Sequence, residues 1–192
     1  MNIHELIEKT RSTRSFDESV PVPFALLYSC ADAARLVASS RNDQVLKFRI
    51  VSRRDEVEAV LALTKWAGHL PELKLPPDGR HPTAFIVICH DRAIAENLAP
   101  YRVDVGIAAE AIVLSASEAG FASCMIGSFD AGAVCRTLAL AENLAPQLVI
   151  AIGKGDERIE MTDAAGGDVK YYRDAEGTHY VPKRSADEVI LR

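Results

Sequence analysis

The feature that most limits the possible folds of this chain is the apolar segment YRVDVGIAAEAIVLSASEAG at residues 101–120. Small and aliphatic residues occupy nearly every helical position of it, and Gly120 is a helix terminator. A helix that is apolar on nearly every side cannot face water. We therefore expect this segment to lie at the centre of the fold or against a second subunit.

Helical and strand patterns are intermixed along the rest of the chain. Apolar residues recur at helical spacing in three other segments, residues 2–9, 23–38 and 54–63, and a short amphipathic helix closes the sequence. Short runs rich in Ile and Val predict strands at residues 47–52, 83–90 and 147–153. Residues 170–180 predict a hairpin around Glu176-Gly177, and the proline-rich residues 69–82 predict a loop, which is a candidate lid. The mixture indicates an α/β or α+β class, and 192 residues suit a single domain over 1–192.

The composition argues against several classes of function. A net charge of −5 is unfavourable for a general nucleic-acid binder, and no apolar run is long enough for a membrane span. Because the first residues lack the apolar core of a signal peptide, a cytoplasmic location is the default expectation. The four cysteines, in apolar surroundings and without metal-ligand spacing, are expected to be buried hydrophobes, so no metal site is predicted.

Two basic clusters lie far apart in the sequence. TRSTRSF at residues 10–16 holds Arg11, Ser12 and Arg14, whose guanidinium and hydroxyl donors suit a phosphate. Lys183-Arg184 follows Pro182 near the other end of the sequence. Each cluster alone could equally be a solvated turn.

A third cluster, SSRNDQ at residues 39–44, leads into the strand LKFRI. If it is extended, Ser40, Asn42, Gln44 and Leu46 share one face. The two amides could match the alternating donors and acceptors of a heterocycle edge, or the segment could be a loop of capping residues. In CMIGSFD, a helix beginning after Gly127-Ser128 could offer backbone N–H groups to a ligand. GKG at residues 153–155 matches neither the Rossmann nor the P-loop pattern.

Taken in order, these segments resemble the nitroreductase family of flavin enzymes, in particular a compact branch of it. The resemblance covers nearly the whole chain and rests on six collinear motifs: RSTRSF, NDQ, DVGIAAE, GFASCMIG, GKG and KYYRDAEGTHYVPKR. It implies an α+β fold with a central, mostly antiparallel sheet flanked by helices. It also implies an intertwined homodimer that binds two FMN molecules at the subunit interface.

The resemblance assigns roles to named residues. Arg11, Ser12, Lys183 and Arg184 would hold the FMN phosphate and ribityl chain, and Arg14 would lie near N1 and O2 of the isoalloxazine. Asn42 and Gln44 would read the pyrimidine edge from the other subunit, and Ile126, Gly127 and Ser128 would line the ring. Ser40 and Leu46 are also expected to contact the cofactor.

The implied activity is an FMN-dependent oxidoreductase, with NAD(P)H as co-substrate and a nitroaromatic or quinone as small-molecule acceptor. No catalytic side chain is expected, because the flavin carries the chemistry. Two positions depart from the family: Thr10 replaces a frequent arginine, and Leu46 replaces a tryptophan. They keep open a non-catalytic flavin-binding sensor or storage module, a specialised reaction such as dehalogenation or desaturation, and a ligand-free interaction domain.

Overall fold

The structure, a computed structural model, describes residues 2–191. Its centre is a five-stranded sheet in which β5 (Leu144–Gly155) pairs antiparallel with β3 (Ala84–Asp91) on one side and β4 (Ala122–Ile126) on the other. β2 (Leu46–Val51) continues the sheet beyond β3, and β1 (Phe16–Asp17) pairs with the far end of β5. This arrangement confirms the predicted α+β class with a mostly antiparallel sheet.

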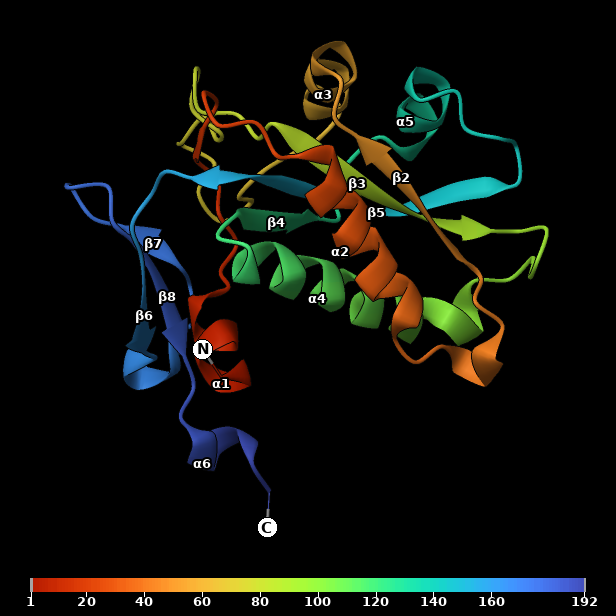
Figure 1. The fold of residues 1–192 in the computed structure, drawn as a ribbon. Helices are drawn as coiled ribbons and strands as arrows, with labels where there is room; N and C mark the ends of the chain where they lie inside the picture. The colour runs from red at the N-terminus through yellow and green to blue at the C-terminus, as the bar shows by residue number, and fades with distance from the viewer. Residues whose placement is uncertain (1, 192) are drawn as a thin grey trace.

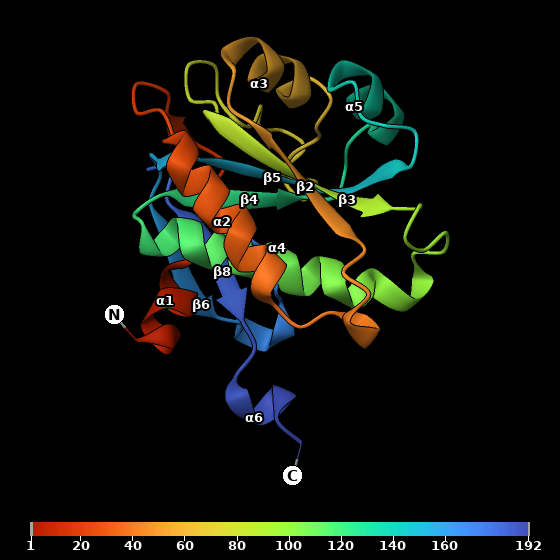
Figure 2. The same ribbon diagram turned by 45° about the vertical axis from the view of Figure 1, so that its right-hand side comes forward.

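Helices cover both faces of the central sheet, as Figure 1 shows. One face carries α3 (Arg54–Leu61) and α5 (Ala131–Thr137), and the other carries α2 (Phe24–Leu36) and α4 (Arg102–Glu118). In Figure 2, α2 lies across α4 on their shared face. The predicted helices and strands therefore exist, with ends within a few residues of the expected ones.

Strand β3, with the sequence AFIVICHD, shows why residues 84–89 are apolar without interruption. All eight of its residues are buried. Ile86 and Ile88 pack into the core under α2 and α4, whereas Phe85 and Val87 pack into the core under α3 and α5. A strand covered on both faces takes apolar side chains along most of its length, so the continuous run replaces the alternation of a half-exposed strand, and the polar residues His90 and Asp91 come only at its end.

A second sheet stands at one end of the molecule, next to α1 (Ile3–Lys9) in both views (Figures 1 and 2). In it, β8 (His179–Lys183) pairs parallel with β6 (Ile159–Asp163) and antiparallel with β7 (Tyr172–Arg173). The β7–β8 connection confirms the predicted hairpin, whereas β6 was not predicted. The remaining short helices are 3₁₀ turns at Ser40–Asn42, Ala99–Tyr101 and Ala165–Gly167, and α6 at Ala186–Val189.

Helix α4 meets the expectation of burial on one side only. It buries Ala109, Ile112 and Ala116 against the sheet and α2, and it leaves Val103 and Ile107 exposed. Residues 66–82 form a loop without helix or strand, as expected. Among residues 2–191, no helix combines the length and apolar character that crossing a membrane would require.

Candidate functional site

The segment that follows α1 is fixed to the central sheet by backbone contacts. The Thr13 N–H donates to the Ser123 carbonyl at 2.9 Å, and the adjacent Ser12 forms a parallel bridge with Ser123. Three residues further on, Phe16 is fully buried and lies directly on Gly153. A Cβ at Gly153 would lie 2.8 Å from Cδ1 of Phe16, so the first glycine of GKG is a packing requirement and no part of a phosphate loop.

Beside this anchored segment lies a cavity of about 410 Å³, called here the cationic cavity. Arg11, Ser12 and Arg14 enter it from one end of the sequence and Lys183 from the other. The other lining residues are Thr10, Glu110, Val113, Ser123, Met125, Tyr171, His179 and Val181. Arg184 does not line the cavity; its Nη1 lies 3.7 Å from Oε1 of Glu188.

Arg11 carries a donor without an acceptor. Its Nη2 donates to the Ile7 carbonyl, while its buried Nε has no hydrogen-bond partner among the described residues. A buried, charged donor left unpaired is costly, and an anion entering the cavity would remove that cost. The donor set of Arg11, Ser12, Arg14 and Lys183 therefore fits a phosphate.

The charge of Arg14 is not neutralised by a carboxylate. Its Nη1 donates to the Ser12 carbonyl and lies 3.1 Å from Nε2 of His179. The guanidinium carbon lies 4.9 Å from the centre of the Tyr171 ring, within cation–π range. Within residues 2–191, no carboxylate oxygen comes within ion-pair distance of the Arg14 side chain. Its charge therefore remains available to a ligand.

The nearby acid, Glu157, is already engaged. It accepts the backbone N–H of Arg14 and forms an ion pair with Arg173. Burial raises the pKa of Glu157, while the backbone N–H of Arg14 and the charges of Arg173 and Arg14 oppose that rise. Arg173 thus holds the carboxylate that could otherwise pair with the Arg14 guanidinium.

Residues 39–44, called here the amide loop, are not extended, so the predicted shared face is wrong. Residues Ser40–Asn42 form a 3₁₀ turn, and φ is positive at Arg41 (53°), Asn42 (57°) and Gln44 (51°). Left-handed residues other than glycine are uncommon, and they concentrate where a structure holds a ligand or a strained turn. Asn42 and Gln44 are both exposed.

Asp104 at the beginning of α4 holds the amide loop in this conformation. Its buried carboxylate accepts hydrogen bonds from the Ser39 hydroxyl at 3.0 Å, from the Ser40 N–H at 2.9 Å and from the Ser40 hydroxyl at 2.7 Å. The N–H and the hydroxyl of Ser40 are therefore both used in holding the loop to α4. The aspartate of the DVGIAAE motif acts here as an anchor for the loop.

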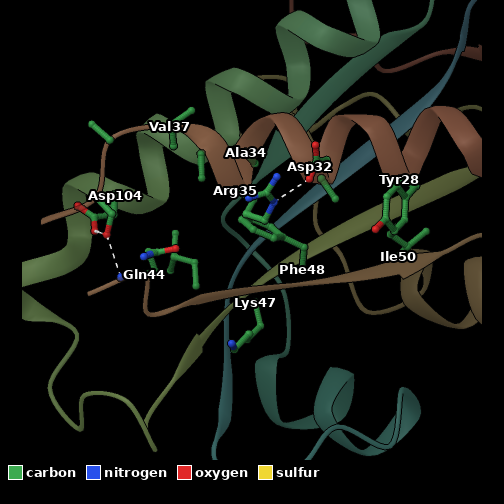
Figure 3. A pocket seen from close by; sticks show the side chains of 15 residues that line it. Tyr28, Asp32, Ala34, Arg35, Val37, Gln44, Lys47, Phe48, Ile50 and Asp104 are labelled. Atoms are coloured by element: carbon green, nitrogen blue, oxygen red, sulfur yellow. Dashed lines mark hydrogen bonds and ion pairs between the residues drawn. The ribbon is translucent and has the colours of Figure 1, made fainter. Parts of the chain in front are cut away.

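A second cavity of about 410 Å³, called here the apolar groove, runs between α2 and β2 (Figure 3). Tyr28, Phe48 and Ile50 line one part of it, and Gln44 and Leu46 line the end beside the amide loop. The groove contains no lining residue from either basic cluster. Leu46 therefore shapes an apolar surface away from the cationic cavity.

The two sets of predicted ligand contacts lie on opposite sides of α4. Asp104 carries the amide loop, whereas Val113 and Glu110 line the cationic cavity. At 3.6 residues per turn, Asp104 and Val113 point about 180° apart, and they are separated by roughly 13 Å along the axis. Within a single chain, the amides of Asn42 and Gln44 therefore do not reach the arginines of the cationic cavity.

The structure corrects the position of Ile126. This residue ends β4 and is 4% exposed, packed in the core under α3 and α5. Because side chains alternate along a strand, Met125 and Ser123 line the cationic cavity instead. Gly127 and Ser128 are exposed, and no helix begins at Ser128: α5 begins at Ala131. The Asp130 side chain caps α5 by accepting the Ala133 N–H at 2.9 Å.

Several cavity residues had no role in the sequence prediction, among them Glu110, Met125, Tyr171 and His179. Tyr171 and His179 belong to the hairpin motif, but only the fold brings them to Arg14. Three of the four cysteines are buried, as expected, and burial raises the pKa of Cys30 and Cys124 to about 11 and that of Cys89 to about 12. In the described part of the chain, no cluster of His, Cys, Asp or Glu suits a metal ion.

Comparisons with known proteins agree with this architecture. A sequence profile described as the nitroreductase family matches residues 7–154. Among solved structures, a nitroreductase family protein from Streptococcus pneumoniae TIGR4 superposes with a TM-score of 0.70 at 21% identity, covering 100% of both chains. A protein from Staphylococcus epidermidis named as an NAD(P)H:FMN oxidoreductase has a TM-score of 0.71 at 18% identity, covering 100% of this chain and 95% of that one. At such identities the structural matches establish the fold alone.

Proposed function

Because this chain belongs to the nitroreductase family of flavin-dependent oxidoreductases, we propose that it binds FMN at the cationic cavity and uses NAD(P)H to reduce an electron-poor small molecule. Nitroaromatics and quinones are the acceptor classes. The observation that carries the proposal is the convergence of Arg11, Arg14 and Lys183, from opposite ends of the sequence, on one cavity. When bound, the flavin would supply the hydride chemistry.

In this proposal, different side chains of the cavity bind different parts of the anionic ligand. Arg11 would hold the phosphate through its unpaired Nε, with Ser12 and Lys183 beside it. Lys183 would supply the charge that the Thr10 position lacks. Arg14, whose charge no carboxylate neutralises, would stabilise the negative charge that the isoalloxazine gains on reduction.

The proposal includes a homodimer, because one protomer leaves its two ligand-binding groups on opposite sides of α4. In a symmetric pair, the amide loop of one protomer could reach the cationic cavity of its partner. The exposed apolar side chains of α2 and α4 support such an interface. They include Phe24 (60% exposed), Tyr28 (63%), Leu36 (68%) and Val103 (69%).

A spectroscopic experiment tests the proposed function. The purified protein is incubated with FMN, desalted and examined for bound flavin absorbance. NADH or NADPH is then added without oxygen, and a quinone afterwards. We expect the absorbance to bleach and then to recover. A bound flavin that never bleaches would replace the proposal with a flavin-binding module, and failure to retain FMN would reject the cofactor itself.

A further inference from the structure

His179, the first residue of β8, is enclosed by the groups that surround Arg14. It is 1% exposed, and it lies opposite Arg173 of β7 and Ile159 of β6 in the sheet register. Its Nε2 lies 3.1 Å from Nη1 of Arg14, and its ring centre is 5.3 Å from that of Tyr171. Its buried Nδ1 has no hydrogen-bond partner within residues 2–191.

The chemistry of Arg14 fixes the protonation of this ring. A guanidinium has only donors, so the contact is a hydrogen bond only if Nε2 of His179 is the acceptor. The imidazole must then be neutral, with its proton on Nδ1.

The charges around the ring favour the same state. Arg14 and Arg173 are cations, Tyr171 contributes a neutral ring, and the carboxylate of Glu157 is already bound by Arg173. Burial first, and then the charges of Arg14 and Arg173, lower the pKa of His179 to about 4.

We propose that His179 is a positioning residue: a neutral imidazole that holds the Arg14 guanidinium at the cationic cavity without cancelling its charge. A carboxylate at the same place would fix the side chain equally well but would neutralise it. A hydrocarbon side chain would leave the guanidinium free to turn away. A neutral acceptor is the chemical type that gives both a fixed position and a full positive charge for an anionic ligand.

The inference rests on the proposed function where it concerns FMN. It predicts different FMN affinities for two variants of His179. In His179→Gln, the amide oxygen can accept from Arg14 but cannot titrate, so the FMN dissociation constant at pH 7 should stay within about threefold of the wild-type value. In His179→Leu, the acceptor is lost, and binding should weaken about tenfold, as for a hydrogen bond to a charged group. Equal affinities of the Leu variant and the wild type would overturn the positioning role.

Acidification provides a second readout of binding. Protonated His179 would repel Arg14, so the wild type should lose affinity for FMN below about pH 5 more steeply than His179→Gln does. The FMN phosphate itself titrates near pH 6, so the difference between the two proteins isolates the histidine. Parallel pH profiles would contradict the inference.

The deciding experiment needs no flavin. In the ¹⁵N NMR spectrum of the flavin-free protein, His179, assigned through the Gln variant, should be neutral at pH 6 with its proton on Nδ1, and should titrate only near pH 4. A proton on Nε2, or a cationic ring at pH 6, would overturn the assignment. If the spectrum is as expected but no FMN binds, the proposed function fails while the position of Arg14 stands.

Discussion

The contact between Gly153 and Phe16 leads to a prediction that can be worked out from the structure. In Gly153→Ala, the new methyl carbon would lie 2.8 Å from Cδ1, 3.1 Å from Cγ and 3.3 Å from Cβ of Phe16. Carbon atoms in good contact are about 3.5–4.0 Å apart, so the ring must move by more than about half an ångström. Phe16 is 0% exposed and enclosed by the core, which leaves it no free space.

The magnitude follows from two opposing effects. Overpacking of a close-packed core costs about 1–3 kcal/mol. Replacing glycine also restricts the unfolded chain, which returns about 0.4–1 kcal/mol. The net expectation is a loss of about 1–2 kcal/mol in the free energy of unfolding, or about 2–8 °C in Tm for a chain of this size. Since Phe16 follows Arg14 by two residues, the variant should also bind FMN less tightly.

Urea unfolding of the flavin-free protein at one protein concentration measures this loss. Gly132→Ala in α5 is the matched control, because its methyl would have no contact closer than 3.5 Å; its stability should equal or exceed that of the wild type. Phe16→Leu should cost less in the Gly153→Ala background than in the wild type. Strict additivity of the two substitutions, or a Gly153→Ala protein as stable as the wild type, would refute the steric explanation.

The remaining predictions concern charged groups. Arg14→Ala should weaken FMN binding and make the potential of the bound flavin more negative, as redox titration would measure. Asp104→Asn loses part of a buried acceptor of three hydrogen bonds, so it should cost about 2 kcal/mol in urea unfolding and speed hydrogen exchange of the Ser40 amide. The pKa of His179 falls from 6.5 to about 4 on folding, so the unfolded chain binds its proton at a higher pH than the folded chain does. As the pH falls from about 6.5 to 4, the free energy of unfolding should therefore drop by about 3 kcal/mol. The drop should be smaller in His179→Gln. Arg173→Met should lower the free energy of unfolding by up to about 3–5 kcal/mol, because Glu157 loses its ion pair with Arg173, and a second substitution, Glu157→Gln, should restore most of it.

The parts of this fold that could be predicted from the sequence are those specified locally. The apolar run of β3 reflects burial on both of its faces, and the apolar residues Ala109, Ile112 and Ala116 of α4 reflect burial on one side of that helix. The predicted hairpin depends on Gly177, whose φ of 84° suits a tight turn. Strand β4 was missed because its five residues include a serine and a cysteine, a mixture without a clear period.

The amide loop shows why local reasoning fails at the candidate site. An alternating pattern predicts an extended segment, and nothing in SSRNDQ itself forces Arg41, Asn42 and Gln44 into the left-handed region. That conformation depends on Asp104, more than sixty residues further along the chain, which binds Ser39 and Ser40. The error at Ile126 has a different origin: a motif identifies the strand, but only its register with β5 decides which residues face the cavity.

Charge presents the same difficulty in a sharper form. The sequence shows Arg14, Arg173, Glu157 and His179 as four separate titratable residues, and their types alone would permit Arg14 to pair with the acid. The fold decides otherwise, because β7 places Arg173 on Glu157 while β8 places the imidazole on Arg14. A full positive charge is thereby left at the cavity by a contact that spans 165 residues. Whether an arginine is available to a ligand thus depends on which other residues bind the nearby carboxylates. A binding motif alone indicates where the arginine lies, but not whether its charge is neutralised.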